Sequence, residues 1–208
     1  MTTLSRRVEV APERLEAWIA GFADRHGSMV RTEGPRLVRL TGADGAVAEI
    51  DVPFPPLPAD GDLVGHALRP RRVGLVLVRR GGFAAGIAEG GRLLAGRTGT
   101  RHVQGRSAAG GWSQQRFARR RDAQTARLVA AATRLVVDQV LPAAASLDGV
   151  LVGGDRLLLR QVLTAPAVAS LAPLVSDRVL DVPDPRRAVL EEVARRSRSV
   201  VVRIGEPP

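Results

Sequence analysis

Two closely spaced glycine turns constrain the middle of this 208-residue chain more than any other feature. Residues 73–78 are apolar or glycine, which predicts a buried strand. The segment 79–82, Arg-Arg-Gly-Gly, and the pair Gly90-Gly91 are typical of tight hairpin turns, because glycine adopts positive φ at little cost. The spacing therefore predicts a three-stranded antiparallel meander over residues 73–78, 83–89 and 92–100.

After the meander the chain alternates helices and strands. A long helix is predicted over residues 114–141, with Ser113 as its N-cap and Pro142 at its end. Beyond it we expect strands over residues 149–153, 177–182 and 200–204, and helices over residues 156–163, 165–174 and 185–198. The fold class is therefore α/β (α+β), a mixed sheet in which an antiparallel meander precedes alternating strands and helices.

The first 60 residues follow a different pattern. We expect a strand over residues 7–10, a helix over residues 13–25 that starts behind Pro12, and a hairpin over residues 37–52. A cluster of prolines then interrupts the periodicity: Pro53, Pro55, Pro56 and Pro58. We predict a small N-terminal strand–helix–hairpin unit over residues 1–60 and a larger domain over residues 61–208.

Positive charge is concentrated in one part of the chain. The window 90–121 contains eight arginines and no acidic residue, and the whole chain has a net charge of +10. A balance this basic favours a polyanionic partner, nucleic acid before an anionic membrane. All 31 basic residues are arginine, whose planar guanidinium suits bidentate phosphate contacts.

The predicted long helix has two unlike faces. Helical spacing places apolar residues on one of them: Phe117, Leu128, Ala132, Leu135 and Val136. Arginines fall on another: Arg116, Arg120, Arg127 and Arg134. This arginine stripe either grips RNA phosphates or is ordinary solvated charge.

The loop before this helix has the composition of a substrate-contacting segment. The four residues 108–111 are alanine or glycine, so its backbone can approach a substrate closely. Gln114 and Gln115 follow, and their amides can orient a water molecule or a ribose hydroxyl.

Other common chemistries have no support in the sequence. The chain has no cysteine, its three histidines lack metal-ligand spacing, and no Gly-x-Ser-x-Gly elbow is present. Gly153-Gly154 is expected to be a strand-to-helix turn rather than a phosphate cradle. We therefore expect neither a metal nor an organic cofactor. No run of about 18 apolar residues occurs, so we expect no membrane-spanning helix and a cytoplasmic location.

A family resemblance begins at the loop. Residues 110–121, Gly-Gly-Trp-Ser-Gln-Gln-Arg-Phe-Ala-Arg-Arg-Arg, resemble the Gly-Gly-Gln-Ser-x-x-Arg-Phe-x-Arg segment of archaeal and eukaryotic class-one peptide-chain release factors. The meander and the later Asp-Gly-Val-Leu-Val-Gly-Gly strand occur in the same order as in their catalytic domain. The resemblance covers roughly residues 73–200 and is closest to the Vms-like release factors, in their actinobacterial branch. It implies a release-factor catalytic-domain-like fold with RNase H-like layering.

This resemblance also implies a function. Members are peptidyl-tRNA hydrolases that free nascent peptides on stalled ribosomal large subunits during ribosome-associated quality control. The implied partners are the large subunit, its rRNA and the CCA end of peptidyl-tRNA. We expect a cytoplasmic monomer that acts in translation termination or ribosome rescue and has no membrane partner.

The family glutamine that follows Gly-Gly is replaced here by Trp112. The resemblance therefore transfers the catalytic role to Gln114 first and Gln115 second, supported by Gly110, Gly111 and Ser113. The predicted RNA-binding residues are Arg101, Arg106, Trp112, Arg116, Arg119, Arg120, Arg121 and Arg127. Two alternatives remain open at this point: an endonuclease that cleaves tRNA near its 3′ end with the same loop, and a ribosome- or tRNA-binding module without activity.

Overall fold

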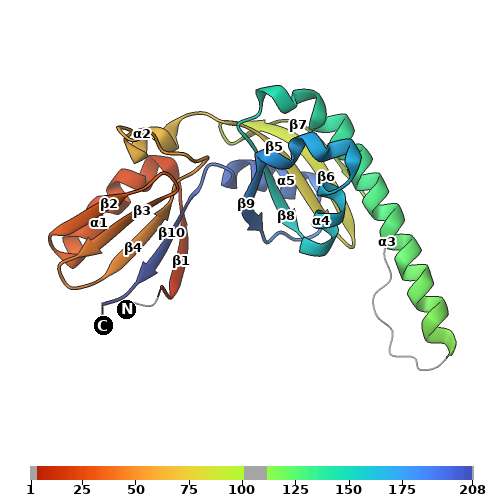
Figure 1. Ribbon diagram of the computed structural model, residues 1–208, viewed down its shortest axis with the longest axis horizontal. Helices are drawn as coiled ribbons and strands as arrows, with labels where there is room; N and C mark the ends of the chain where they lie inside the picture. The colour runs from red at the N-terminus through yellow and green to blue at the C-terminus, as the bar shows by residue number, and fades with distance from the viewer. Residues whose placement is uncertain (1–3, 101–111, 208) are drawn as a thin grey trace. The chain divides into compact units, whose positions relative to one another are not determined.

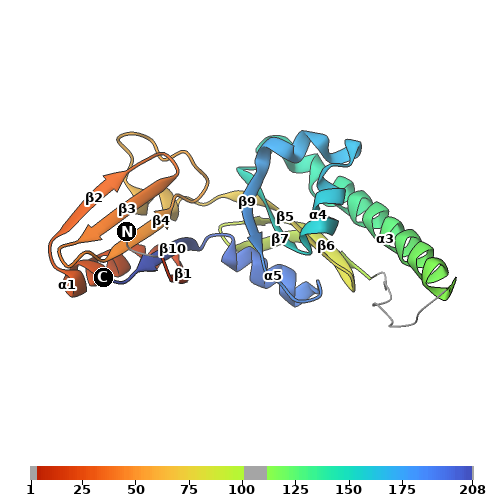
Figure 2. The same ribbon diagram turned by 60° about the horizontal axis from the view of Figure 1, so that its bottom comes forward.

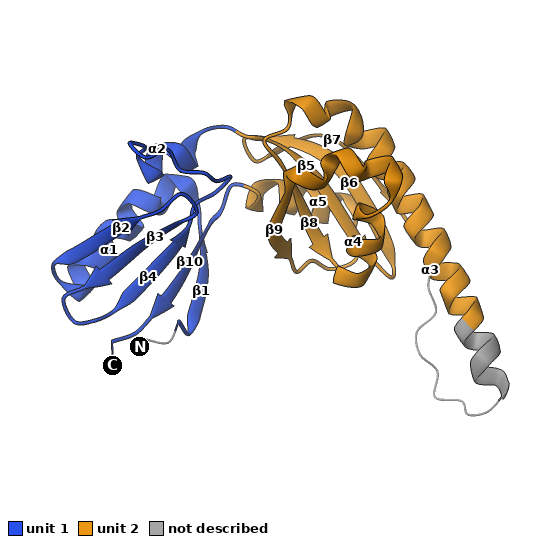
Figure 3. Ribbon diagram, viewed as in Figure 1, with its two compact units in different colours: residues 1–70, 198–208 blue, residues 71–197 orange. Residues whose placement is uncertain are grey.

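The chain divides into two compact units. The computed structural model describes residues 4–100 and 112–207, and for residues 112–118 it describes the backbone alone. Unit 1 comprises residues 1–70 and 198–208, and unit 2 comprises residues 71–197 (Figure 3). Unit 2 is thus inserted into unit 1 ahead of the last strand. The predicted boundary after residue 60 falls ten residues early, and the prediction that all later residues form one domain differs from the structure.

Unit 1 is an antiparallel sheet covered on one face by helices. Its strand order is β1-β10-β4-β3-β2, with β1 at Arg6–Val10, β2 at Met29–Glu33, β3 at Leu37–Gly42, β4 at Val47–Asp51 and β10 at Val200–Gly205. A short 3-10 turn, η1 (Pro12–Arg14), leads into α1 (Leu15–His26), and α2 (Leu63–Leu68) follows β4. Leu15 and Phe22 of α1 and Leu63 of α2 are buried in the core over this sheet. Neither β2 nor α2 was predicted from the sequence.

The last strand corrects one of our predictions. We expected residues 200–204 to continue the alternation of the second half, but β10 lies between β1 and β4 and pairs antiparallel with both. The first and last strands of the chain therefore pair in unit 1 (Figure 1). The physical reason is burial: Val200 and Val202 fill the core of unit 1, and β10 supplies the backbone hydrogen bonds that β1 and β4 need.

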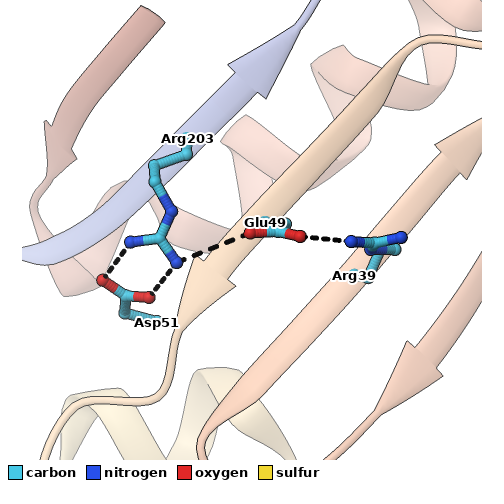
Figure 4. Close-up of polar contacts among 4 residues, drawn as sticks. All are labelled: Arg39, Glu49, Asp51 and Arg203. Carbon is cyan, nitrogen blue, oxygen red and sulfur yellow. Dashed lines mark hydrogen bonds and ion pairs between the residues drawn. The ribbon is translucent and has the colours of Figure 1, made fainter. Parts of the chain in front are cut away.

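The outer face of the unit 1 sheet carries an ion-pair cluster (Figure 4). Arg203 of β10 donates to both carboxylate oxygens of Asp51, with Nη1–Oδ2 at 3.0 Å and Nη2–Oδ1 at 2.6 Å. The same guanidinium lies 3.6 Å from Glu49, which also binds Arg39 of β3. Three strands are thus joined by charges that neutralise one another.

Unit 2 is built on a mixed five-stranded sheet of order β7-β6-β5-β8-β9. The strands are β5 (Arg72–Arg79), β6 (Gly82–Glu89), β7 (Arg92–Gly99), β8 (Gly149–Gly154) and β9 (Val175–Leu180). The first three form the predicted antiparallel meander, with Gly90 and Gly91 at φ 55° and 85° in its second turn. Next, β8 pairs parallel with β5, and β9 pairs parallel with β8. The predicted fold class is confirmed.

Helices cover both faces of the unit 2 sheet (Figures 1 and 2). One face packs against α3 (Trp112–Gln139) and α4 (Arg156–Leu163), with the 3-10 segments η2 (Leu141–Ser146) and η3 (Pro166–Leu174). The other face packs against α5 (Arg187–Arg196). Residues 73–78 of β5 are all buried because alternate side chains enter different cores.

Among the described residues, no single helix is both long and apolar enough to cross a membrane. The segments α4 and η3 reach that length and composition only as a pair, which is bent by 109°.

Candidate functional site

The long helix α3 follows the loop at which the sequence analysis placed the function. From residue 112 to 141 the chain has no glycine and no proline and is rich in alanine and arginine, which favours an uninterrupted helix. The helix ends at Gln139, and Pro142 lies just beyond, inside η2. It begins at Trp112, so Ser113 lies in its first turn and is not the N-cap that we predicted.

The C-terminal half of α3 anchors it to the sheet. Leu128, Ala132, Val136 and Val140 recur every fourth residue and are all buried. Val140 packs where Gly74 of β5 has no side chain: a Cβ on Gly74 would lie 2.7 Å from Val140 Cγ1. The helix and strand therefore approach closely at the base of α3.

The N-terminal half of α3 projects from the sheet (Figures 1 and 3). Residues 119–127 are exposed or half-buried, and the first buried residue is Leu128. At 1.5 Å per residue, the helix start at Trp112 lies about 24 Å from Leu128 along the axis. We call residues 112–127 the arm. The arm carries the start of α3, with its glutamines, well away from the body of unit 2.

The strand that leads into the loop is held at its end by an aromatic ring. Phe83 of β6 lies opposite Gly99 of β7, and a Cβ on Gly99 would lie 2.4 Å from Phe83 Cζ. Phe83 therefore covers the last residue of β7, two residues before the loop begins at residue 101.

The structure places the predicted catalytic residues as follows. Gly110 and Gly111, together with Arg101 and Arg106, lie outside the described residues. The other candidates occupy the first turns of α3, where the backbone is helical: Trp112, Ser113, Gln114, Gln115 and Arg116. Helical positions 114 and 115 are about 100° apart around the axis, so the two glutamines are not equivalent.

The predicted exposure of the arginine stripe is confirmed for its described members, because Arg120, Arg127 and Arg134 are exposed. Of the other predicted RNA-binding arginines on the helix, Arg119 is exposed and Arg121 is half-buried. None of these five forms an ion pair with another described residue. From residue 123 to 137 the helix has no acidic residue at all. Free guanidinium groups along a rigid helix are available to bind phosphates.

Charge is divided unequally between the two units. Unit 1 has 10 arginines against 11 acidic residues, a formal charge of −1, whereas unit 2 has 21 against 10, a formal charge of +11. The basic character of the chain thus belongs to the unit that carries the arm.

The glycine pair at the end of β8 is a turn, as predicted. Gly154 has φ +109°, and a Cβ there would lie 2.2 Å from the Val78 carbonyl oxygen. Asp155 caps α4, because its carboxylate accepts hydrogen bonds from the amides of Leu157 and Leu158. The anion position at this helix end is therefore filled by the chain itself.

No metal centre is visible in the part of the chain that the structure describes: it contains no group of three or more histidine, aspartate or glutamate side chains that could hold an ion.

Comparisons with known proteins identify the family. Residues 71–203 match the family described as Actinobacteria/chloroflexi VLRF1 release factor, a range that includes all of unit 2 and β10 up to Arg203. No curated protein matches the chain.

Three solved structures are among those with a similar backbone arrangement. The archaeal translation termination factor aRF1 is 14% identical with a TM-score of 0.39, over 89% of this chain and 62% of that one. The Vms1 mitochondrial localization core is 13% identical with a TM-score of 0.46, over 83% and 77%. A structure described as an archaeal protein is 17% identical with a TM-score of 0.38, over 84% and 51%. The chain thus spans less than two thirds of the archaeal factor. On the match over residues 71–203, this chain belongs to the actinobacterial and chloroflexi VLRF1 release factor family.

Proposed function

We propose that this protein hydrolyses the ester bond of peptidyl-tRNA on stalled ribosomal large subunits and so frees the nascent peptide. The proposal depends above all on one observation: a helical arm about 24 Å long projects from unit 2 and starts with the glutamine-containing motif. Membership of a release factor family supports the same reading. The protein would act as a monomer in the cytoplasm, within ribosome-associated quality control.

In this mechanism the arm brings its tip to the CCA end of the tRNA. The small residues before it, Gly110 and Gly111, permit close approach of the backbone. The Gln114 amide holds a water molecule beside the ester carbonyl, an effect of proximity and orientation, with Gln115 as the alternative donor. The water oxygen attacks the carbonyl carbon and the bond to the ribose 3′ oxygen breaks. That oxygen takes a proton from the water, and the peptide leaves with a free carboxylate.

In this mechanism the described arginines of the arm bind RNA. Arg119, Arg120 and Arg127 are exposed on the arm without acidic partners among the described residues. Guanidinium groups form bidentate, charge-assisted hydrogen bonds with phosphates. Binding along the arm would hold the tip at the reacting bond.

The density of arginines also favours a second candidate. A ribose 2′ hydroxyl near the tRNA 3′ end could attack the adjacent phosphate, which would release the downstream 5′ hydroxyl and leave a cyclic phosphate. Arginines stabilise the negative charge that develops on that phosphate. The two candidates differ in product: a peptide with a free carboxylate and an intact tRNA, or a peptide that still carries 3′ nucleotides.

The test is peptide release from purified stalled large subunits, followed by sequencing of the tRNA 3′ ends. The variants are Gln114→Ala, Gln115→Ala and the pair, and Gln139→Ala at the other end of α3 is the matched control. We expect loss of the essential glutamine to slow release about 100-fold, a typical cost of misplacing a reactant. Shortened tRNA ends would favour the endonuclease. Unchanged release by the double variant would overturn both enzymatic proposals and leave an RNA-binding module.

A further inference from the structure

The helix α4 carries two arginines that the proposed mechanism does not use. Arg156 and Arg160 are exposed and lie one turn apart, at positions i and i+4. Leu157 between them is 71% exposed, more than any other large apolar residue that the structure describes. The opposite face of α4 is buried through Leu158, Leu159 and Val162. The three exposed residues therefore point away from the core.

The two charges on α4 repel each other. Two like charges one turn apart repel each other, and α4 contains no acidic residue that could offset them. Arg156 is the first residue of the helix, where the backbone dipole disfavours a cation, whereas Arg160 lies in the last turn, where the dipole favours one. Neither arginine forms an ion pair with another described residue. No ion pair with a described residue offsets the repulsion between Arg156 and Arg160, and a bound polyanion would offset it.

The α4 pair is continuous with the arginines of α3. The two helices pack against each other on the same face of the sheet, as both views show (Figures 1 and 2). Arg127 and Arg134 are exposed on α3, opposite its buried spine. Packed helices lie about 8–10 Å apart, so the two arginine pairs belong to one surface.

The opposite face of unit 2 is different. Its helix α5 also carries arginines, but Arg187 pairs with Glu191 and Arg195 pairs with Glu192. These two arginines of α5 are thus paired with acids, whereas Arg156 and Arg160 of α4 have no such partner among the described residues.

From this placement we propose that Arg156, Leu157 and Arg160, with Arg127 and Arg134, form a second RNA-docking surface that binds the backbone of a double-helical segment of large-subunit rRNA. The partner follows from charge and composition. The surface presents guanidinium groups but no described aromatic side chain on which an unpaired base could stack, which fits the phosphates of a duplex. Leu157 covers ribose between the two phosphate contacts.

The choice of rRNA rests on the proposed function. If the tip of the arm meets the tRNA 3′ end, Arg127 lies about 22 Å back along α3, and α4 lies beside that part of the helix. A surface at that distance from the tRNA 3′ end would meet the large subunit, whose rRNA presents the phosphates that guanidinium groups bind.

The experiment compares two double substitutions in the full chain that remove equal charge. The test variant is Arg156→Ala with Arg160→Ala, and the matched control on the other face is Arg187→Ala with Arg195→Ala. Binding to purified large subunits without tRNA is measured as a function of salt. We expect the test variant to bind about 10-fold more weakly and to lower the salt slope by about 1 for each arginine lost. The control should bind like the wild type.

Thermal unfolding separates docking from folding. The test variant should unfold at the same temperature as the wild type or higher, because alanine relieves the repulsion and favours the helix. Equal binding by the two double variants would overturn the proposal. So would a loss that appears only with isolated tRNA or only with anionic lipid vesicles.

The experiments distinguish an error in the proposed hydrolase function from an error in the proposed docking surface. If the α4 variant binds large subunits like the wild type while release still requires Gln114 or Gln115, the docking surface is wrong and the hydrolase stands. If the wild type releases no peptide while the α4 pair still governs binding to large subunits, the hydrolase is wrong and the docking surface stands.

Discussion

Unit 1 and unit 2 use the same residue, arginine, in opposite ways. In unit 1, Arg203 and Arg39 are bound to Asp51 and Glu49 on the outer face of the sheet, and the formal charge of the unit is −1. In unit 2, Arg120, Arg127 and Arg134 stand exposed on α3 without an acidic partner among the described residues, and the formal charge is +11. These arginines of unit 1 join strands, whereas the exposed arginines of α3 in unit 2 supply a positive field for a polyanion.

The strongest way to break this comparison is to remove residues 198–208. The strand β10 lies between β1 and β4 in the unit 1 sheet. Its loss leaves β1 without a partner strand, leaves β4 paired with β3 alone, and opens the core at Val200 and Val202. We expect unit 1 to unfold, which is a loss of about 5 kcal/mol or more. Unit 2 should stay folded and keep its affinity for RNA.

Hydrogen exchange measured across the chain checks this result, because the amides of each unit report separately. Removal of residues 206–208 alone is the control, since they follow the strand. Protected amides in unit 1 of the variant that lacks residues 198–208 would show that β10 is dispensable. Unit 1 would then fold without the segment that follows unit 2 in the sequence.

Two neighbouring residues of α3 sharpen the comparison inside unit 2. Leu128 is fully buried, and Leu128→Ala should lower the free energy of unfolding by about 2–5 kcal/mol. Arg127 is exposed, and Arg127→Ala should change stability by less than about 0.5 kcal/mol while weakening RNA binding. Denaturant unfolding and RNA titration of both variants check the pair. If Arg127→Ala destabilised the protein as much as Leu128→Ala, the arginine would be structural.

In unit 1 we expect the loss of an arginine to lower stability and to leave RNA binding unchanged. Arg203→Ala removes both hydrogen bonds that the guanidinium donates to the Asp51 carboxylate on the outer face of the sheet. We expect a loss of about 1–2 kcal/mol, because the pair is part-buried and only partly screened by solvent. RNA affinity should not change. Arg160→Ala in unit 2 is the matched control for stability, and an equal loss in both variants would contradict the division of roles.

The features that the sequence predicted are local. The meander follows from an apolar run and two glycine turns, and the two faces of α3 follow from spacing along one helix. The partner of β10 did not follow, because Val202 pairs with Ile50 across 151 intervening residues and no local pattern encodes that pairing. The boundary was misplaced for the same reason.

Within the candidate site, the exposure of arginines on α3 was predicted. Spacing predicted that Arg120, Arg127 and Arg134 would be exposed, but it missed Arg156 and Arg160. A signal for them existed: two arginines at helical spacing around an exposed leucine, in a helix without any acid. The roles of Gln114 and Gln115 remain predictions, because they depend on side chains outside the described part of the chain.

The smallest expected effect concerns a carboxylate in a turn of unit 1. Asp44, in the turn between β3 and β4, binds Nδ1 of His26 at 2.8 Å and accepts a hydrogen bond from the Ala46 amide at 2.9 Å. These contacts, chiefly the one to His26, lower the pKa of Asp44. Because the folded pKa lies below the unfolded one, the ionised carboxylate stabilises the fold above about pH 4, and this contribution is lost as the pH falls through the folded pKa.

Asp44→Asn should therefore lower the melting temperature slightly at neutral pH, and its difference from the wild type should shrink on acidification. Asp24→Asn, an exposed carboxylate on α1, is the matched control and should show no such trend. Thermal unfolding of the three proteins between about pH 3 and pH 7 measures it. A difference that stays constant over this range would mean that Asp44 acts through the shape of the turn rather than through its charge. The contrast between paired charge in unit 1 and free charge in unit 2 would then rest on the Arg203 cluster.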